Sequence, residues 1–319
     1  MLVGNEGAVA KLKEFASLCH QFLQGRPSIF ELRCRLERLG KFYRVDPLPP
    51  KRRVVAVDGS LGTVGSHFPY FLVLMQAVAF ALPPLDSPLV EHEVFSPLKP
   101  EVREYLEERA QKERGAPDLM AEQRVRELMT ALELRVALQV AEALPGALVL
   151  LDGGFVPFRN RAGELFQALC ERALEGGVLL VGVIEEIASR RLGEAVGLGF
   201  TGFSPHDREV LYGCLDLGEV FELEEDEEEP FIRVFARFGH HPQPVAFDFL
   251  REQKEFLPEI LGVLRALTPA DGRGIPSLID LADRYVRLQA AEVERLVAVT
   301  VPPELREVFL SSHRRRRPF

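Results

Sequence analysis

Apolar and polar positions along the first half of the chain predict helices, then strands, then helices again. Residues 8–40 carry apolar side chains at helical spacing, with a break and a helix cap at Pro27-Ser28. From residue 51 the apolar positions become continuous or alternate, which indicates strands at 54–57, 68–82 and 89–95. Residues 99–144 return to a helical and strongly charged pattern. A three-stranded meander between two helical stretches is therefore predicted.

Strands and helices alternate in the second half. Continuous apolar runs at 148–152 and 178–184 indicate buried strands, with helical spacing between them at 164–174. Further strands are predicted at 231–238 and 245–249, and an amphipathic helix at 277–297. The order of elements resembles the ribonuclease H fold. We therefore expect an α/β fold with a mixed sheet, flanking helices, an N-terminal helical appendage, and additional C-terminal strands and a helix.

The chain is long enough for one large domain with appendages. It has 319 residues, 47% of them hydrophobic, and no Gly/Ser-rich linker divides it. We expect a helical appendage at 1–50, one α/β domain at 51–300 and a basic tail at 301–319, which contains Arg314 to Arg317.

The net charge of −9 argues against a surface that coats nucleic acid unspecifically. Part of the acidic excess lies in residues 222–229, which we expect to form a solvated loop. Local basic clusters are nevertheless sufficient to follow a phosphate backbone. Their alternative interpretation is a solvated face. The candidate DNA-binding residues are Arg53, Arg159, Arg161, Arg190 and Arg191.

Several classes of protein are disfavoured. No apolar stretch approaches the length needed to cross a bilayer, and the N-terminus lacks a basic segment followed by an apolar one, so we expect no membrane association and a cytoplasmic location. The four cysteines form no Cys-x-x-Cys pair, which argues against a zinc site or a disulfide framework. Many arginines and prolines, with no tryptophan, fit a thermophilic protein.

Two predicted strands end in the same way, at Asp58-Gly59-Ser60 and at Asp152-Gly153-Gly154. Each glycine permits a sharp turn or a close approach of a ligand backbone. Carboxylates at adjacent strand ends form a site for hard divalent cations. The alternative is that Asp-Gly is only a common turn dipeptide after a strand.

Two aspartates are too few to hold two metal ions, so further acidic ligands have to come from the helices. The helix before the second Asp-Gly strand offers Glu127, Glu133 and Glu142. Glu133 stands among apolar residues, where a carboxylate is costly unless it is paired or metal-bound. Its alternative is a salt bridge with Arg126 or Arg135.

The predicted helix at 277–297 supplies a fourth candidate. Asp280 and Asp283 are three residues apart and so lie on one face. We prefer Asp283, because Asp280 can cap the helix or pair locally. The alternative for Asp283 is a surface acid paired with Arg284 or Arg287.

At these residues the chain resembles the NurA family of nucleases, which process DNA ends together with the hexameric ATPase HerA. The resemblance covers about residues 50–300 and rests on the order of several blocks. These are Val57 to Ser60, Leu132 to Leu134, Leu150 to Gly154, Val181 to Val183, Ser204 to Leu211 and Gly274 to Leu278.

The resemblance implies that Asp58, Glu133 and Asp152 hold Mn²⁺ or Mg²⁺, as two ions, and that Asp283 completes the catalytic set. It further implies a homodimer around a DNA channel that docks onto a HerA-like hexameric translocase. The chain lacks a Gly-x-x-x-x-Gly-Lys-Ser/Thr loop, so ATP-driven movement has to come from that partner.

The chain departs from the family at three positions. Ile275 stands where the family has a tyrosine, Asp283 where it has a histidine, and Glu185 where a lysine is common. Aspartate occurs at the equivalent helix position in other ribonuclease H-like nucleases. Two alternatives to an active DNA nuclease therefore stay open: a weakened scaffold that binds DNA or the ATPase ring, and an unrelated metal phosphohydrolase acting on nucleotides.

Overall fold

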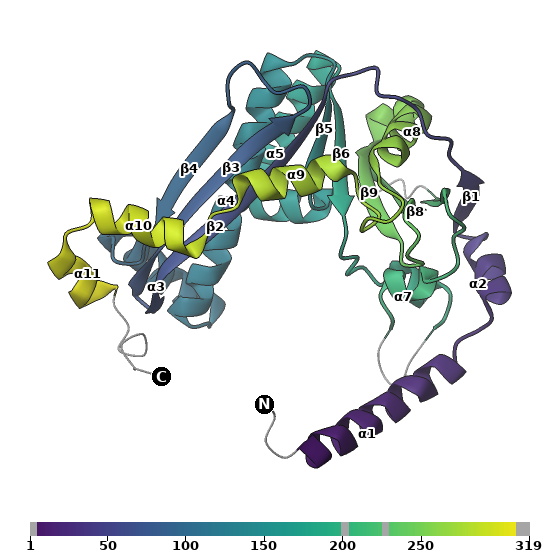
Figure 1. The fold of residues 1–319 in the computed structure, drawn as a ribbon, viewed down its shortest axis with the longest axis horizontal. Helices are drawn as coiled ribbons and strands as arrows, with labels where there is room; N and C mark the ends of the chain where they lie inside the picture. Colours follow the sequence, from purple (N-terminus) through teal and green to yellow (C-terminus); the bar gives the residue numbers. More distant parts are fainter. Residues whose placement is uncertain (1–4, 199–203, 225–229, 311–319) are drawn as a thin grey trace.

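The computed structural model describes residues 5–198, 204–224 and 230–310. Its centre is one nine-stranded mixed sheet with helices on both faces (Figure 1). The strands lie in the order β1-β7-β8-β9-β6-β5-β2-β3-β4. Neighbours in this order are far apart in sequence at several places, so long-range pairing builds the sheet.

Five strands form the half of the sheet expected from the sequence. They are β2 (Val54–His67), β3 (Tyr70–Ala81), β4 (Val90–Phe95), β5 (Leu148–Asp152) and β6 (Leu179–Ile184). The first three make an antiparallel meander, while β5 runs parallel to both β2 and β6. This order and these directions are those of the ribonuclease H fold. The predicted fold class is confirmed.

Four further strands extend the sheet beyond β6. They are β9 (Val245–Leu250), β8 (Phe231–Arg237), β7 (Glu219–Leu223) and β1 (Gly40–Arg44), and all their pairings are antiparallel. The sequence pattern predicted β8 and β9 but neither β1 nor β7. Each of these missed strands is only five residues long and carries polar side chains, so neither makes a continuous apolar run.

The interpretation of residues 222–229 as a solvated loop is wrong at its start. Glu222 lies in β7 and is buried. Its carboxylate accepts a hydrogen bond from the Tyr43 hydroxyl at 2.7 Å and pairs with Lys41 at 3.1 Å. These partners come from β1, so local sequence could not reveal them. Residues 225–229 lie outside the described residues.

Helices cover each face of the sheet with an apolar layer. On one face lie α3 (Pro100–Glu113), α4 (Pro117–Ala143) and α5 (Phe155–Gly176), and on the other lie α8 (Leu257–Leu267) and α9 (Ser277–Val286). Figure 1 shows α9 crossing in front of the sheet, with α4 and α5 behind it. The site residues come from both layers.

The remaining helices lie towards the two ends of the sheet. Three helices pack on the β7–β9 extension: α2 (Ile29–Leu36), α6 (Arg191–Ala195) and α7 (Asp207–Leu211). Helix α1 (Asn5–Gln24) precedes α2 in the sequence, and the 3₁₀ turn η1 (Arg251–Phe256) follows β9. The predicted helix at 277–297 is two helices, since α9 ends at Val286 and α10 covers Ala290–Thr300, before α11 (Pro303–Phe309). None of the described helices is both long and apolar enough to cross a membrane.

Candidate active site

Asp58 and Asp152 lie on neighbouring parallel strands. Val57 of β2 is in register with Leu151 of β5, and each aspartate is the next residue along its strand. Strand β5 ends at Asp152, whereas β2 continues to His67. The two carboxylates therefore lie on adjacent strands at the point where β5 ends. The predicted strand end is confirmed at Asp152 and is wrong at Asp58.

Glu133 reaches this point from α4, on the opposite face of β2 from α9. An ideal Cβ atom on Gly59 would lie 2.7 Å from Oε1 of Glu133 and 2.6 Å from Cε of Met129. Gly59 is inside β2, so its interpretation as a turn glycine is wrong. Its lack of a side chain gives Glu133 the room to approach Asp58. Within the described residues Glu133 pairs with neither Arg126 nor Arg135, and Arg126 instead pairs with Glu122.

Helix α9 packs against β2 and places Asp283 on that side of the site. The helix buries Leu278, Ile279, Ala282 and Val286 against the sheet. Two hydrogen bonds fix its C-terminal end: Gln76 Nε2 donates to Val286 O at 2.6 Å, and Leu288 N donates to the Ser60 hydroxyl at 3.0 Å. Asp283 is half-buried and pairs with Arg287 at 2.6 Å, the pairing considered as its alternative.

Two more carboxylates and an arginine stand beside Asp152. Arg273 donates to Glu185 at 2.6 Å and also pairs with Asp280. Glu185 follows β6, and Asp280 is in the first turn of α9, so the guanidinium group joins two elements that flank Asp152. Arg273 was not singled out from the sequence, because it lies in an irregular segment before Ile275. The unusual acidic residue Glu185 was the sequence signal that could have indicated a cation nearby.

The pKa values show how strongly these acids interact. Burial, followed by the negative charge of Asp152, raises the pKa of Asp58 to about 7. Desolvation, followed by the charge of Glu185, raises the pKa of Asp152 to about 6, whereas Arg273 acts in the opposite direction. Burial and the charges of Asp58 and Asp152 raise the pKa of Glu133 well above its ordinary value. The carboxylates thus repel one another.

This donor set fits a hard divalent cation. All its members offer carboxylate oxygens, the preferred ligands of Mg²⁺ and Mn²⁺, and added positive charge would relieve their repulsion. In residues 5–198, 204–224 and 230–310, no three His, Cys, Asp or Glu side chains are close enough to form a finished metal-binding group. Asp58, Glu133, Asp152 and Asp283 therefore interact electrostatically without forming a finished metal-binding group in the described residues.

The candidate DNA-binding arginines lie at different distances from this cluster. Arg161 lowers the pKa of Glu133 and is therefore near it. Arg53 directly precedes β2, five residues before Asp58, and donates to the carbonyl oxygens of Pro83 and Pro84. Arg159 lies over the Phe231 ring at 5.2 Å. Arg190 and Arg191 are exposed at the start of α6.

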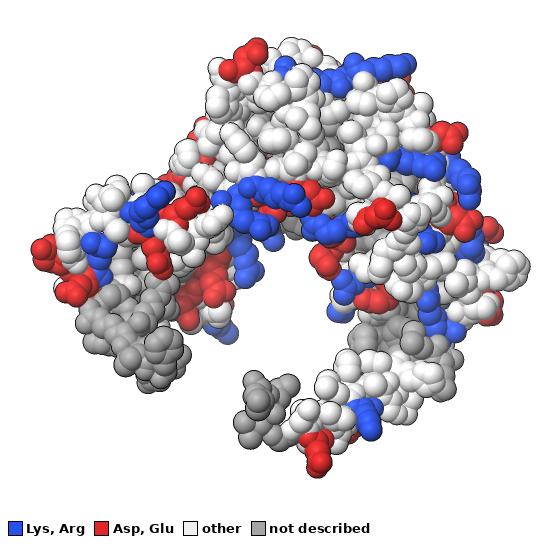
Figure 2. Space-filling view, viewed as in Figure 1, with Lys and Arg blue, Asp and Glu red and all other residues white. Residues whose placement is uncertain are grey.

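Basic and acidic side chains alternate where α9 crosses the sheet. Figure 2 shows Lys and Arg atoms over α9 with Asp and Glu atoms beside them. The other acidic candidates are engaged elsewhere: Glu127 pairs with Arg109 at 2.7 Å, and Glu142 is exposed. Ile275 is buried in the core under α9 and has no polar role there.

A family model described as the NurA domain matches residues 52–288. The NurA nuclease from Sulfolobus solfataricus is similar in structure, with a TM-score of 0.59 and 15% identity over 94% of this chain and 96% of that chain. The catalytic domain of human Endonuclease V matches with a TM-score of 0.38 and 16% identity, over 86% of this chain and 97% of that chain. Endonuclease V from Bacillus subtilis gives a TM-score of 0.36 and 12% identity, over 84% and 90%. No curated protein gives a significant match.

Proposed function

The chain belongs to the NurA family, and from that membership we propose that it is a divalent-metal-dependent DNA nuclease. The proposed reaction is hydrolysis of phosphodiester bonds in single strands or at DNA ends. It uses Mn²⁺ or Mg²⁺, as two ions. The similarity to the Sulfolobus nuclease along nearly the whole chain supports a nuclease.

The observation that carries the proposal is the meeting of Asp58 and Asp152 with Glu133. The charge of Asp152 raises the pKa of Asp58, and the charges of both aspartates raise the pKa of Glu133, at the place where β5 ends. A fold gains no stability from such mutual repulsion, so a functional role explains it better. Carboxylates with strongly perturbed pKa values at the end of parallel strands mark a reactive site.

Each side chain has a distinct part in the proposed mechanism. Asp58 and Asp152 are the central ligands, Glu133 approaches over Gly59 from the α4 side, and Asp283 approaches from the α9 side. Two ions held by these residues would supply activation of water for attack on the phosphodiester and stabilisation of the leaving oxygen. Asp58 and Asp152 must be ionised to bind, which their pKa values allow above about pH 7.

The DNA backbone is proposed to contact arginines around the cluster. Arg159, Arg161, Arg190 and Arg191 are exposed and add positive charge to that of Arg273 and Arg287 in the site. Arg53 belongs to the same proposed set but is half-buried just before β2. Contacts of this kind hold the backbone without reading the base sequence.

The direct test is digestion of end-labelled single- and double-stranded DNA with Mn²⁺, Mg²⁺ or EDTA. We expect cleavage that depends on the metal and is lost in Asp58→Ala and in Asp152→Ala, with circular dichroism and unfolding showing that both variants are folded. Full activity in both variants would contradict the assignment of the site. End-labelling also gives the direction of digestion.

The wider proposal is that the protein acts as a homodimer beside a HerA-like hexameric ATPase in recombinational repair of DNA ends. Light scattering after size exclusion tests the dimer. Co-purification with such an ATPase, followed by cleavage with and without ATP, tests the partnership. A monomer that does not bind the ATPase would contradict the proposed dimer and the proposed partnership, and it would leave the nuclease proposal unaffected.

A weakened scaffold is the second candidate, and the pairing of Glu185 with Arg273 favours it. This arrangement holds the positive charge of Arg273 near Asp152, where it repels a divalent cation. DNA binding without cleavage in any metal, with the ATPase present, would support the scaffold.

A further inference from the structure

A buried carboxylate lies directly behind the turn that follows Asp152. It belongs to Asp248 of β9, which is 1% exposed. Its Oδ2 accepts a hydrogen bond of 2.9 Å from the backbone N–H of Phe155, the first residue of α5. Asp248 therefore holds the chain three residues after Asp152, although the two aspartates lie on strands that do not pair.

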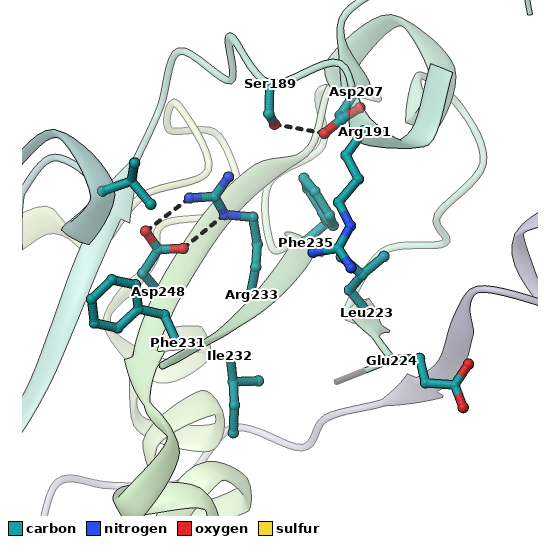
Figure 3. Close-up of a pocket in the computed structure, with 11 residues that line it drawn as sticks. Ser189, Arg191, Asp207, Leu223, Glu224, Phe231, Ile232, Arg233, Phe235 and Asp248 are labelled. Carbon is teal, nitrogen blue, oxygen red and sulfur yellow. Dashed lines mark hydrogen bonds and ion pairs between the residues drawn. The ribbon is translucent and has the colours of Figure 1, made fainter. Parts of the chain in front are cut away.

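Arg233 of β8 supplies the counter-charge for this carboxylate. Its Nε and Nη2 atoms donate to the two oxygens of Asp248 at 2.7 and 2.9 Å (Figure 3). This two-pronged geometry fixes the orientation of the carboxylate as well as its charge. Both oxygens of Asp248 therefore accept hydrogen bonds from Arg233, and the oxygen that also accepts from Phe155 has one defined position.

Three glycines leave room for this contact. Asp248 is paired across the sheet with Gly182, where an added Cβ would lie 2.7 Å from the carbonyl oxygen of Gly153. At Gly154 an added Cβ would lie 2.9 Å from Ile184 and 3.1 Å from Oδ2 of Asp248. Gly153 has a φ of +133°, which side chains rarely allow, and its N–H donates to Val183 O at 2.8 Å. The turn is packed closely on β6 and on Asp248.

Asp248 also replaces a missing helix cap. The N-cap residue of α5 is Gly154, which has no side chain to accept from the first turn. The negative charge of Asp248 lies at the positive end of the first segment of α5, which is interrupted by non-helical backbone at Ala162, and an anion is favourable at a helix start. A distant strand thus caps the helix that begins right after the metal-site strand.

We propose that Asp248, oriented by Arg233, is a positioning residue that fixes the turn after Asp152 and so sets the direction of the Asp152 carboxylate. Asp248 touches neither DNA nor the ion in this role and acts through Phe155. This inference rests on the proposed function, because it concerns the affinity of the site for a divalent cation. Partners that orient a metal ligand typically change affinity by about 10–100-fold when they are removed.

The chain offers a matched control elsewhere in the sheet. Glu219 of β7 is 8% exposed, accepts from Arg33 at 2.7 and 2.8 Å, and accepts from the backbone N–H of Asp216 at 2.8 Å. It has the same kind of partners as Asp248, but β7 is three strands from β6 in the sheet. Loss of either carboxylate removes the ion-pair partner of a half-buried arginine and lowers stability.

The experiment compares the wild-type full-length protein with Asp248→Ala, Asp248→Asn, Glu219→Ala and Glu219→Gln. Mn²⁺ alone is titrated by calorimetry, and hydrogen exchange is followed by mass spectrometry in the segment 152–158. We expect Asp248→Ala to lower Mn²⁺ affinity by about tenfold or more and to speed exchange in this segment. Asp248→Asn keeps an oxygen for Phe155 and should lie between it and the wild type. Both Glu219 variants should keep Mn²⁺ affinity within about twofold, despite lower unfolding temperatures.

Equal Mn²⁺ affinities in the Asp248 and Glu219 variants would overturn the inference, and so would unchanged exchange in segment 152–158. If Asp248→Ala does not fold, the comparison of Asp248→Asn with Glu219→Gln decides in the same way. Failure of the wild-type protein to bind Mn²⁺ would contradict the proposed function itself and this inference with it. Failure confined to the variants would contradict the inference alone.

Discussion

Glu133 occupies the space that a side chain on Gly59 would need. The Oε1 atom of this glutamate is 2.7 Å from the ideal Cβ position of Gly59, well inside normal contact. Gly59 is in the middle of β2 and makes no turn. The glycine after Asp58 is therefore required for the approach of a second carboxylate from α4, which brings the acids of two different layers together.

Gly59→Ala is expected to displace Glu133 and weaken cleavage. The added methyl group forces the carboxylate or Met129 to shift, so we expect DNA cleavage to fall by about tenfold or more. Initial rates at saturating Mn²⁺ measure the effect. Gly163→Ala is the control, because nothing lies within 4 Å of its added Cβ. Equal rates in Gly59→Ala and the wild type would show that the position of Glu133 is unimportant.

Asp58→Asn is expected to stabilise the metal-free protein at high pH. The pKa of Asp58 is raised from 3.8 to about 7 on folding, so the folded state binds the proton more tightly and stability falls as the pH rises from about 4 to 7. Asparagine cannot ionise. We expect the variant to gain about 2–4 kcal/mol at pH 8 and little at pH 4.

Denaturant unfolding in EDTA at both pH values tests this stability prediction. The exposed Asp86→Asn substitution controls for loss of a negative charge alone. An Asp58→Asn gain that is the same at pH 4 and pH 8 would contradict the prediction, because it could not come from ionisation of the carboxyl group.

Binding of Mn²⁺ is expected to strengthen as the pH rises through 6 and 7. Protons compete with the ion for carboxylates whose pKa values are about 6 for Asp152 and about 7 for Asp58. Calorimetric titration from pH 5.5 to 8 should show affinity rising and then levelling off. Affinity that is constant over this range would place the ion elsewhere. Glu219→Gln, remote from the site, should follow the wild-type curve.

Arg273→Ala is expected to raise the pKa of Asp152 further. The guanidinium group lowers this pKa, and its removal also leaves Glu185 and Asp280 without their shared cation. Mn²⁺ binding should therefore shift to higher pH. The loss of stability should be only about 0.5–1 kcal/mol, because Arg273 is partly exposed.

The same calorimetric titration measures the Arg273 effect. Arg172→Ala removes an exposed ion pair with Glu175 on α5 and serves as the control for loss of an arginine. If the two variants give the same pH profile, Arg273 has no influence on the metal site.

Arg161→Ala is expected to weaken DNA binding more than Arg53→Ala. Arg161 is exposed and close enough to Glu133 to lower its pKa, whereas Arg53 is half-buried and donates to the carbonyl oxygens of Pro83 and Pro84. Loss of one phosphate contact should reduce the salt dependence of single-strand binding by about 0.7 in a plot of log affinity against log salt. Fluorescence anisotropy in EDTA measures both variants. A larger loss of DNA binding in Arg53→Ala than in Arg161→Ala would contradict the proposed position of the DNA near Arg161.

The sequence by itself determined the central pairing and its two aspartates. Apolar runs that end in Asp-Gly indicated β2 and β5, and their similarity placed Asp58 and Asp152 together, because buried strands have a strong local pattern. The isolated Glu133 was likewise visible as a charge among apolar residues. The predicted ribonuclease H order of strands follows from the same local patterns.

Only the tertiary structure decided how the acids meet and what holds them. Strands β1 and β7 are short and polar, and they form because distant segments pair: β1 with β7, and β7 also with β8. Asp248 is a single charge in the apolar strand β9, the same kind of signal as Glu133, but only strand pairing sets it beside Arg233 and behind the Asp152 turn. The role of Gly59 likewise depends on a helix more than 70 residues away. Local periodicity specifies which face a residue takes, whereas contacts between distant segments arise only when the sheet and its two helical layers assemble.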